Sequence, residues 1–208
     1  MATTPKALTY EEWLKLPEVE GIEEVVNGEI RRTPPNKIIH ADTVENLTDL
    51  LKTKLDRNTV QVRVSTFGLV IRREPLTTRV PDIAVFIRKN VVEMDGYIHS
   101  APELVIEVLS AANTRVERAE KLKDYGSLGV PEVWVVSPEA RTVELLQLKG
   151  GQFAVVALRN EGQVAPLHFP EASIDIGSTL FTTPDESPTA LFKRARKCGA
   201  SRVGVEVE

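Results

Sequence analysis

The apolar positions of this chain follow two different periods, and each period predicts a different kind of element. Val44, Leu47, Leu51 and Leu55 recur every three or four positions within residues 38–55, which is the spacing of one helix face. Elsewhere, short runs are almost wholly apolar, which is typical of strands buried on both faces. The chain is therefore expected to combine helices with buried strands.

Turn and capping residues set the limits of the other predicted elements. Asn113-Thr114 is expected to cap a second helix, which runs to about Leu128 and ends at Gly129-Val130-Pro131. Asn27-Gly28 is typical of a tight hairpin turn between two strands. Further strands are predicted at residues 60–64, 68–72, 104–109, 132–136, 142–148 and 153–158. The first two of these strands are expected to pair with each other.

This order of elements predicts a mixed α/β domain, in which a twisted central sheet carries helices on its faces. Residues 104–136 form a strand–helix–strand unit, which is expected to be a parallel crossover. The length of 208 residues suits one domain, expected to span residues 1–181. Residues 182–208 are expected to form a C-terminal tail that is partly flexible.

Composition narrows the class of protein. The formal net charge of −4 argues against a broadly basic nucleic-acid-binding surface but leaves room for a local basic groove. The single cysteine, Cys198, excludes an intramolecular disulfide and a cysteine-rich zinc site. No apolar run approaches the ~18 residues of a membrane span, and residues 1–10 lack a secretory apolar region. A cytoplasmic protein that does not enter the membrane is the expectation.

Three charged residues lie in or beside apolar stretches, where a charge is costly. Asp82 lies in the stretch 79–87, Glu107 lies in the stretch 104–109, and Lys121 follows in the second predicted helix. A buried carboxylate needs a cation or hydrogen bonds. Two carboxylates on neighbouring strands, with a lysine beside them, meet the needs of a hard divalent cation such as Mg²⁺ and of a hydrolytic water. Helical geometry directs Lys121, and not Lys123, toward the carboxylates.

Each of these residues also has a purely structural interpretation. Asp82 is equally interpretable as a cap on backbone N–H groups in a turn at the start of a strand. Glu107 and Lys121 are also interpretable as a buried structural ion pair. His40 begins the apolar stripe of the first helix and points inward, where a hydrogen-bonded core histidine is the common case. Glu24, before the Asn27-Gly28 turn, has comparable chances of facing the pocket or the solvent.

Taken together, these segments resemble a known family. The chain resembles the Uma-type family of restriction endonucleases, within the PD-(D/E)xK nuclease superfamily, from about Tyr10 to Leu148. The resemblance rests on six segments in the same order. They are Glu24 to Glu29, His40 opening a helix, Val80 to Val85, Leu104 to Ser110, Glu120 to Tyr125 and Gly129 to Trp134.

The resemblance implies a restriction-endonuclease-like fold, in which a mixed central sheet is flanked by helices. It also implies that Asp82 and Glu107 bind Mg²⁺ or Mn²⁺, that Lys121 serves as the superfamily lysine, and that Glu24 and His40 complete the pocket. One departure stands out, because the position two after Glu107 is Leu109 and not lysine. Smaller departures are Asn27 for an aspartate and Val133 for a tyrosine.

Two functions follow as hypotheses. The first is a metal-dependent endonuclease that hydrolyses DNA phosphodiester bonds. The second is a catalytically inactive protein of the same fold that binds nucleic acid or a protein partner. The complete set of Asp82, Glu107 and Lys121 favours the enzyme. The acidic composition and the lack of a DNA-recognition motif weigh against it, and family resemblance fixes the fold better than the activity. The oligomeric state is left open, and a homodimer is one option.

Overall fold

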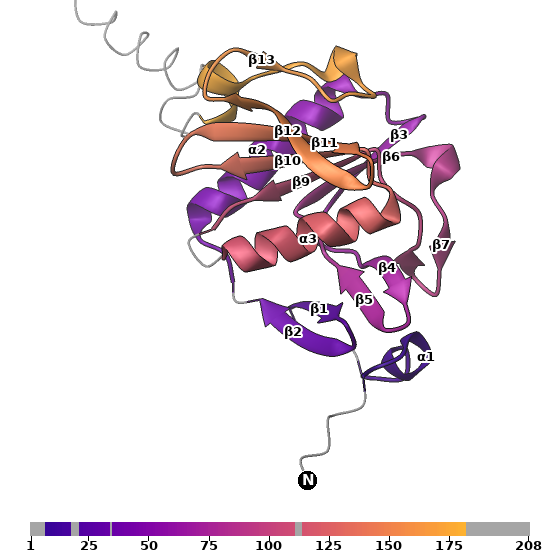
Figure 1. The fold of residues 1–208 in the computed structure, drawn as a ribbon. Coiled ribbons are helices and arrows are strands. Elements are labelled where there is room, and N and C mark those ends of the chain that lie inside the picture. Colours follow the sequence, from indigo (N-terminus) through magenta and orange to yellow (C-terminus); the bar gives the residue numbers. More distant parts are fainter. Residues whose placement is uncertain (1–6, 18–20, 34, 111–113, 182–208) are drawn as a thin grey trace, which may run out of the picture.

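The computed structural model describes residues 7–17, 21–33, 35–110 and 114–181. A six-stranded sheet with the strand order β12-β11-β10-β9-β6-β3 forms its centre. Helices α2 (Ile38–Lys54) and α3 (Arg115–Leu128) cover the sheet (Figure 1). The predicted α/β architecture is confirmed. The predicted tail from residue 182 lies outside the described residues.

The central strands are β3 (Val60–Val64), β6 (Ile83–Ile87), β9 (Leu104–Val108), β10 (Glu132–Ser137), β11 (Thr142–Lys149) and β12 (Gln152–Arg159). Strands β9 and β10 are parallel and are connected through α3, as the sequence predicted. Strands β11 and β12 form the predicted antiparallel hairpin around Gly150 and Gly151. Antiparallel pairing joins β6 to both β3 and β9.

The apolar runs of β6 and β9 are explained by burial on both faces of the sheet. Alternate residues such as Ile83 and Ile106 pack with Leu47 and Leu51 of α2. The intervening residues, including Ala84 and Val105, pack with Tyr125 of α3 in a second cluster. Because neighbouring strand residues point to opposite faces, Glu107 points to the same side as Val105, toward α3.

The ends of α3 show why the helix occupies these residues. The Thr114 hydroxyl accepts a hydrogen bond from the Glu117 N–H, and the Glu117 side chain accepts one from the Thr114 N–H, so a capping box begins the helix. Gly129 ends it with φ of 90°, in the left-handed conformation that glycine favours. The two caps fix the register in which Lys121 faces the sheet.

A second, four-stranded sheet has the order β5-β4-β8-β7. Its strands are β4 (Leu69–Arg73), β5 (Leu76–Arg79), β7 (Glu93–Met94) and β8 (Tyr97–Ile98). The prediction that residues 60–64 and 68–72 pair with each other is wrong. The Ser65 N–H donates to the Asp82 carbonyl at 3.1 Å and the chain then leaves the central sheet, so β4 pairs with β5 and β8 instead.

The N-terminal segment docks on this second sheet through a hairpin. Strands β1 (Ile22–Val26) and β2 (Glu29–Thr33) pair around the predicted Asn27-Gly28 turn, preceded by the short helix α1 (Tyr10–Trp13). The backbone N–H groups of Val25 and Asn27 donate to the hydroxyls of Thr78 and Thr77, at 2.9 and 3.2 Å. These bonds hold β1 against β5.

Three short helical turns complete the described chain: η1 (Arg88–Asn90), η2 (Pro170–Ala172) and η3 (Ile176–Leu180). The two-stranded sheet of β13 (Gln163–Val164) and β14 (Ile174–Asp175) lies beside the last two turns. Within the described ranges, we find no helix that is both long enough and apolar enough to cross a membrane.

We predict that Gly28→Ala destabilises the protein more than Gly96→Ala. Both glycines are the second residue of an Asx-Gly turn, with φ of +83° and +81°, so both variants share the strain of a left-handed alanine, about 1 kcal/mol. Only at Gly28 would the added Cβ lie 2.6 Å from the Ala7 Cβ and 2.7 Å from the Leu8 nitrogen. Equal urea midpoints for the two variants would contradict the observed contact of the N-terminal segment.

Candidate active site

Asp82 and Glu107 come together because β6 and β9 are adjacent. Ile83 pairs with Ile106 in the antiparallel register, so Asp82, one residue before β6, lies beside the end of β9. The Val108 N–H donates a hydrogen bond to Asp82 Oδ2 at 2.7 Å. Asp82 therefore both satisfies a buried backbone donor and stands next to Glu107, whose pKa its charge affects.

Helix α3 supplies two partners to the Glu107 carboxylate. Lys121 Nζ lies 2.7 Å from Glu107 Oε2, and the Tyr125 hydroxyl donates a hydrogen bond to Glu107 Oε1. Lys121 and Tyr125 are four residues apart and so share one helix face. Lys123 is exposed on another face, as its position in the helix predicted.

Glu24 reaches the same cluster from the docked hairpin. Its carboxylate accepts hydrogen bonds from Arg79 Nη1 at 2.8 Å and from the Val80 N–H at 3.0 Å. Lys121 Nζ lies 3.7 Å from Glu24 Oε1, so the lysine stands between two carboxylates. Arg79, only 2% exposed, also pairs with Asp124 of α3 at 2.7 Å.

His40 closes the cluster on the side of α2. Its Nε2 lies 3.3 Å from Asp82 Oδ2, and its ring is buried. The structure thus brings together all five residues singled out from the sequence: Asp82, Glu107, Lys121, Glu24 and His40.

Sequence reasoning missed Arg79, Asp124 and Tyr125 as members of this cluster. Arg79 precedes the Val80–Val85 segment and is the counter-ion that allows Glu24 to be buried. Its partners lie 55 and 45 residues away in the chain, so no local spacing could have identified them. Tyr125 did carry a signal, because it follows Lys121 by one helical turn.

Burial and the neighbouring charges shift the titration of the central pair. Burial raises the pKa of Glu107 to about 6, with a further increase from the Asp82 charge, and Lys121 opposes both. For Lys121, burial lowers the pKa, but the carboxylates of Glu107 and Glu24 outweigh it, and the pKa rises above its ordinary value. Lys121 is therefore a permanent ammonium ion at neutral pH and not a base.

The donor set is compatible with a hard divalent cation. Among the described residues, no three His, Cys, Asp or Glu side chains form a ready-made metal cage. Mg²⁺ does not require one, because proteins usually hold it through one or two carboxylates while waters and substrate phosphates complete the octahedron. Asp82 and Glu107 supply two carboxylates. Burial and, in smaller part, the Asp82 charge raise the pKa of Glu107, and a bound dication would favour its ionised form.

We expect Arg79→Met to destabilise the folded protein by about 3–5 kcal/mol, because it leaves Glu24 and Asp124 buried without their counter-ion. Arg31→Met is the matched control, since it also removes an arginine–glutamate pair, with Glu120 at 2.6 Å, but both of its side chains are more than a third exposed. The control should lose no more than about 1 kcal/mol. Denaturant unfolding measures both values, and similar losses would show that the Arg79 cluster is not a buried network.

Comparisons with known proteins identify the group to which this architecture belongs. The Uma2 family, described as "Putative restriction endonuclease", matches residues 10–177. A crystal structure described as "a putative nuclease belonging to DUF820", from Anabaena variabilis, has a TM-score of 0.69 and 22% sequence identity, covering 84% of this chain and 97% of that one. No curated protein in the comparison matches. The likeness in structure establishes a nuclease-like fold, and the family match over most of the chain shows that this protein belongs to the Uma2 family of restriction-endonuclease-like proteins.

Proposed function

We propose that this protein is a metal-dependent endonuclease that hydrolyses phosphodiester bonds of DNA. The observation that supports it best is the convergence of Asp82, Glu107 and Lys121, from three separate elements, in one largely buried cluster. Family membership supports the reaction class, since the family carries the description "Putative restriction endonuclease".

In this proposal Asp82 and Glu107 hold the cation, Mg²⁺ or Mn²⁺. The bound cation would polarise the scissile phosphate and lower the pKa of a water. Hydrolysis joins the water oxygen to phosphorus and breaks one ester P–O bond. The proton that the water loses passes to solvent, and the leaving oxygen takes up a proton from solvent, so negative charge grows on the phosphate and on the leaving oxygen before that proton arrives.

Lys121 is assigned to that growing charge. Its raised pKa keeps it cationic, so it can donate hydrogen bonds to a phosphate oxygen or orient the attacking water, but it cannot remove the water proton. Glu24 and Arg79 position Lys121 from the hairpin side, and His40 positions Asp82 from α2.

The alternative, a nuclease-fold protein that binds without cutting, is favoured by one observation. Both Glu107 oxygens already have partners, Lys121 on one and Tyr125 on the other. This is also the arrangement of a structural ion pair, in which no metal is needed. The two functions differ in whether Glu107 exchanges these partners for a cation.

We predict that Mn²⁺ binds the wild type. Glu107→Gln removes a proposed ligand, so it should weaken Mn²⁺ binding by more than the ~10–100-fold loss that follows removal of a residue that only supports a ligand. Affinity in the wild type should rise as the pH increases through about 6, because only the ionised Glu107 is a good ligand. That pH dependence should be much smaller in Glu107→Gln. Calorimetry on the folded proteins measures both effects, and a wild type that binds neither Mn²⁺ nor Mg²⁺ would favour the structural ion pair.

We predict that Lys121→Ala slows plasmid cleavage by at least about 100-fold while leaving Mn²⁺ affinity largely intact, because the lysine acts on the phosphate and the water. Lys123→Ala removes an exposed lysine from the same helix and should cleave like the wild type. EDTA should abolish cleavage by the wild type and by Lys123→Ala. Thermal melts must accompany the assay, since breaking a buried pair can unfold the domain. Equal rates for the two lysine variants would remove Lys121 from the proposed mechanism.

A further inference from the structure

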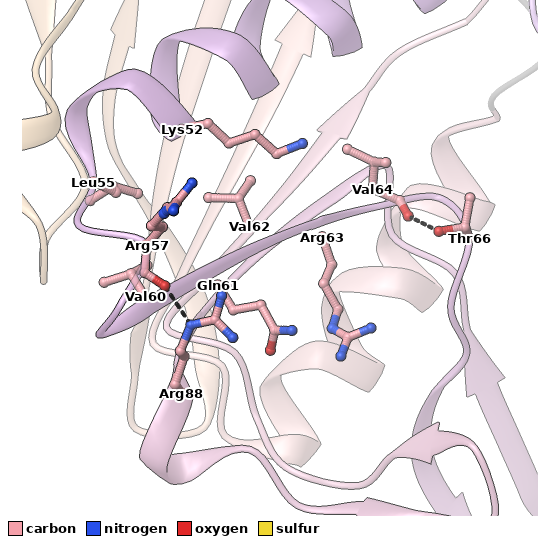
Figure 2. Close-up of a pocket in the computed structure, with 10 residues that line it drawn as sticks. All are labelled: Lys52, Leu55, Arg57, Val60, Gln61, Val62, Arg63, Val64, Thr66 and Arg88. Carbon is pink, nitrogen blue, oxygen red and sulfur yellow. Dashed lines mark hydrogen bonds between the residues drawn. The ribbon is translucent and has the colours of Figure 1, made fainter.

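The outer edge of the central sheet carries a hollow of about 600 Å³. It runs along β3, the last strand in the sheet order, and among the described residues no strand pairs with the outer side of β3. Four basic side chains line the hollow: Lys52, Arg57, Arg63 and Arg88 (Figure 2). We call these four residues, with the β3 edge between them, the basic hollow.

The four cations come from separate parts of the fold. Lys52 belongs to α2, Arg57 to the connection before β3, Arg63 to β3 itself and Arg88 to η1. In Figure 2, Lys52 extends above the strand near Val62, whereas Arg57 and Arg88 lie together at one end. Among the described residues that line the basic hollow, none is an aspartate or a glutamate. This concentration of positive charge contrasts with the net charge of −4 of the whole chain.

The charge of the basic hollow is poorly neutralised. Arg63 pairs with Glu93 at 3.9 Å, where the Glu93 side chain is 57% exposed, and such a contact contributes little. Within the described part of the chain, Lys52, Arg57 and Arg88 take part in no ion pair. Unpaired like charges that converge on a concave surface produce a positive potential that attracts anions.

The basic hollow also leads toward the candidate active site. Its far end is lined by Val64 and Thr66, and between them the Ser65 N–H donates to the Asp82 carbonyl at 3.1 Å. A second hollow of about 460 Å³ shares Lys52 and Val64 with the first and is lined by His40, and it is also lined by the carboxylates of Glu45 and Asp49. A nucleic-acid strand that follows β3 from the basic hollow would pass these two carboxylates before it reaches His40, which contacts Asp82.

We propose that the basic hollow binds the sugar–phosphate backbone of DNA and guides one strand to the carboxylate cluster. The proposal rests on the proposed function for the identity of the polyanion. It adds the path of the substrate, because it places phosphates along the β3 edge, outside the cluster that would carry out the chemistry. Phosphate contacts of this kind fix position and carry no sequence information.

The main competing interpretation is protective. Charged side chains on an edge strand prevent it from pairing with a strand of another molecule. The same charges argue against a second copy of this chain at this edge, because two basic hollows would then face each other. If the charges only protect the edge strand, neutralising the cations should promote self-association and leave DNA binding unchanged.

The test measures DNA binding without cleavage. Fluorescence anisotropy of a labelled DNA duplex is followed in EDTA across a salt series, for the wild type and two triple variants. The groove variant carries Lys52→Gln, Arg57→Gln and Arg63→Gln, and Arg88 is kept because its Nε donates to the Arg57 carbonyl at 2.7 Å. The control variant carries Lys123→Gln, Lys149→Gln and Arg159→Gln, three exposed cations outside the basic hollow. Both variants lower the net charge equally.

We expect the groove variant to bind at least about 10-fold more weakly at low salt, with a salt slope reduced by up to ~0.9 for each phosphate that the variant no longer neutralises. The control variant should keep the wild-type slope. Circular dichroism melts and sedimentation check that both are folded and monitor their association state. Four outcomes would each overturn the proposal. The groove variant binds DNA like the wild type, the control variant loses as much affinity as the groove variant, the groove variant self-associates with unchanged DNA affinity, or the wild type does not bind DNA.

Because no metal is present, the outcome is independent of cleavage. A wild type that binds through the basic hollow but never cuts DNA with Mg²⁺ or Mn²⁺ would refute the proposed endonuclease and leave the DNA path standing. A wild type that cuts DNA, together with a groove variant that binds and cuts equally well, would leave the endonuclease standing and refute the path.

Discussion

The Glu107 carboxylate is buried among the apolar residues of β9, on the face of the central sheet that α3 covers, and the free-energy cost of this burial constrains much of the surrounding structure. Lys121 and Tyr125 offset that cost by binding one carboxylate oxygen each. They can do so only if α3 crosses β9 in one register, which the capping box at Thr114 and the left-handed Gly129 help to set. Even with both partners, burial and the neighbouring Asp82 raise the pKa of Glu107 to about 6. A buried ion pair of this kind contributes little net stability, and a carboxylate with a perturbed pKa is typical of functional sites.

The same constraint extends to the N-terminal hairpin. Glu24 approaches Lys121 because β1 is held on β5 through the hydroxyls of Thr77 and Thr78, and Arg79, at the end of β5, neutralises Glu24. Arg79 also bonds Asp124 on α3, so one guanidinium ties the hairpin to the helix that carries Lys121. The hairpin is thus a structural part of the candidate site, and its position depends on an ion network and not on apolar burial alone.

The parts of this structure that the sequence predicts well are those set by local spacing. Periodicity placed α2 and α3, and helical geometry separated the inward Lys121 from the exposed Lys123. The pairing of strands was harder to predict, because β3 and β4 follow each other closely in sequence and so resemble a hairpin. Only the hydrogen bond from the Ser65 N–H to the Asp82 carbonyl shows that the chain leaves the central sheet between them. The roles of Arg79 and Asp124 were likewise hidden, since a buried cation is identified by partners that are distant in the chain. In the proposed function, metal binding and catalysis require Glu107 to exchange Lys121 and Tyr125 for a cation. Both stay predictions.

The position two residues after Glu107 shows how an ammonium group can reach Glu107 from a helix when the strand carries a leucine. Leu109 points to the same side of the sheet as Glu107 and packs against the cluster beneath α3, while its N–H donates to the Val136 carbonyl at 2.7 Å. A lysine there would face the same helix and displace apolar contacts. In this chain the leucine keeps those contacts, and the ammonium group comes from α3 to within 2.7 Å of Glu107. The proposed chemistry requires an ammonium group beside Glu107, and a helix that crosses the strand can supply that group as well as the strand itself.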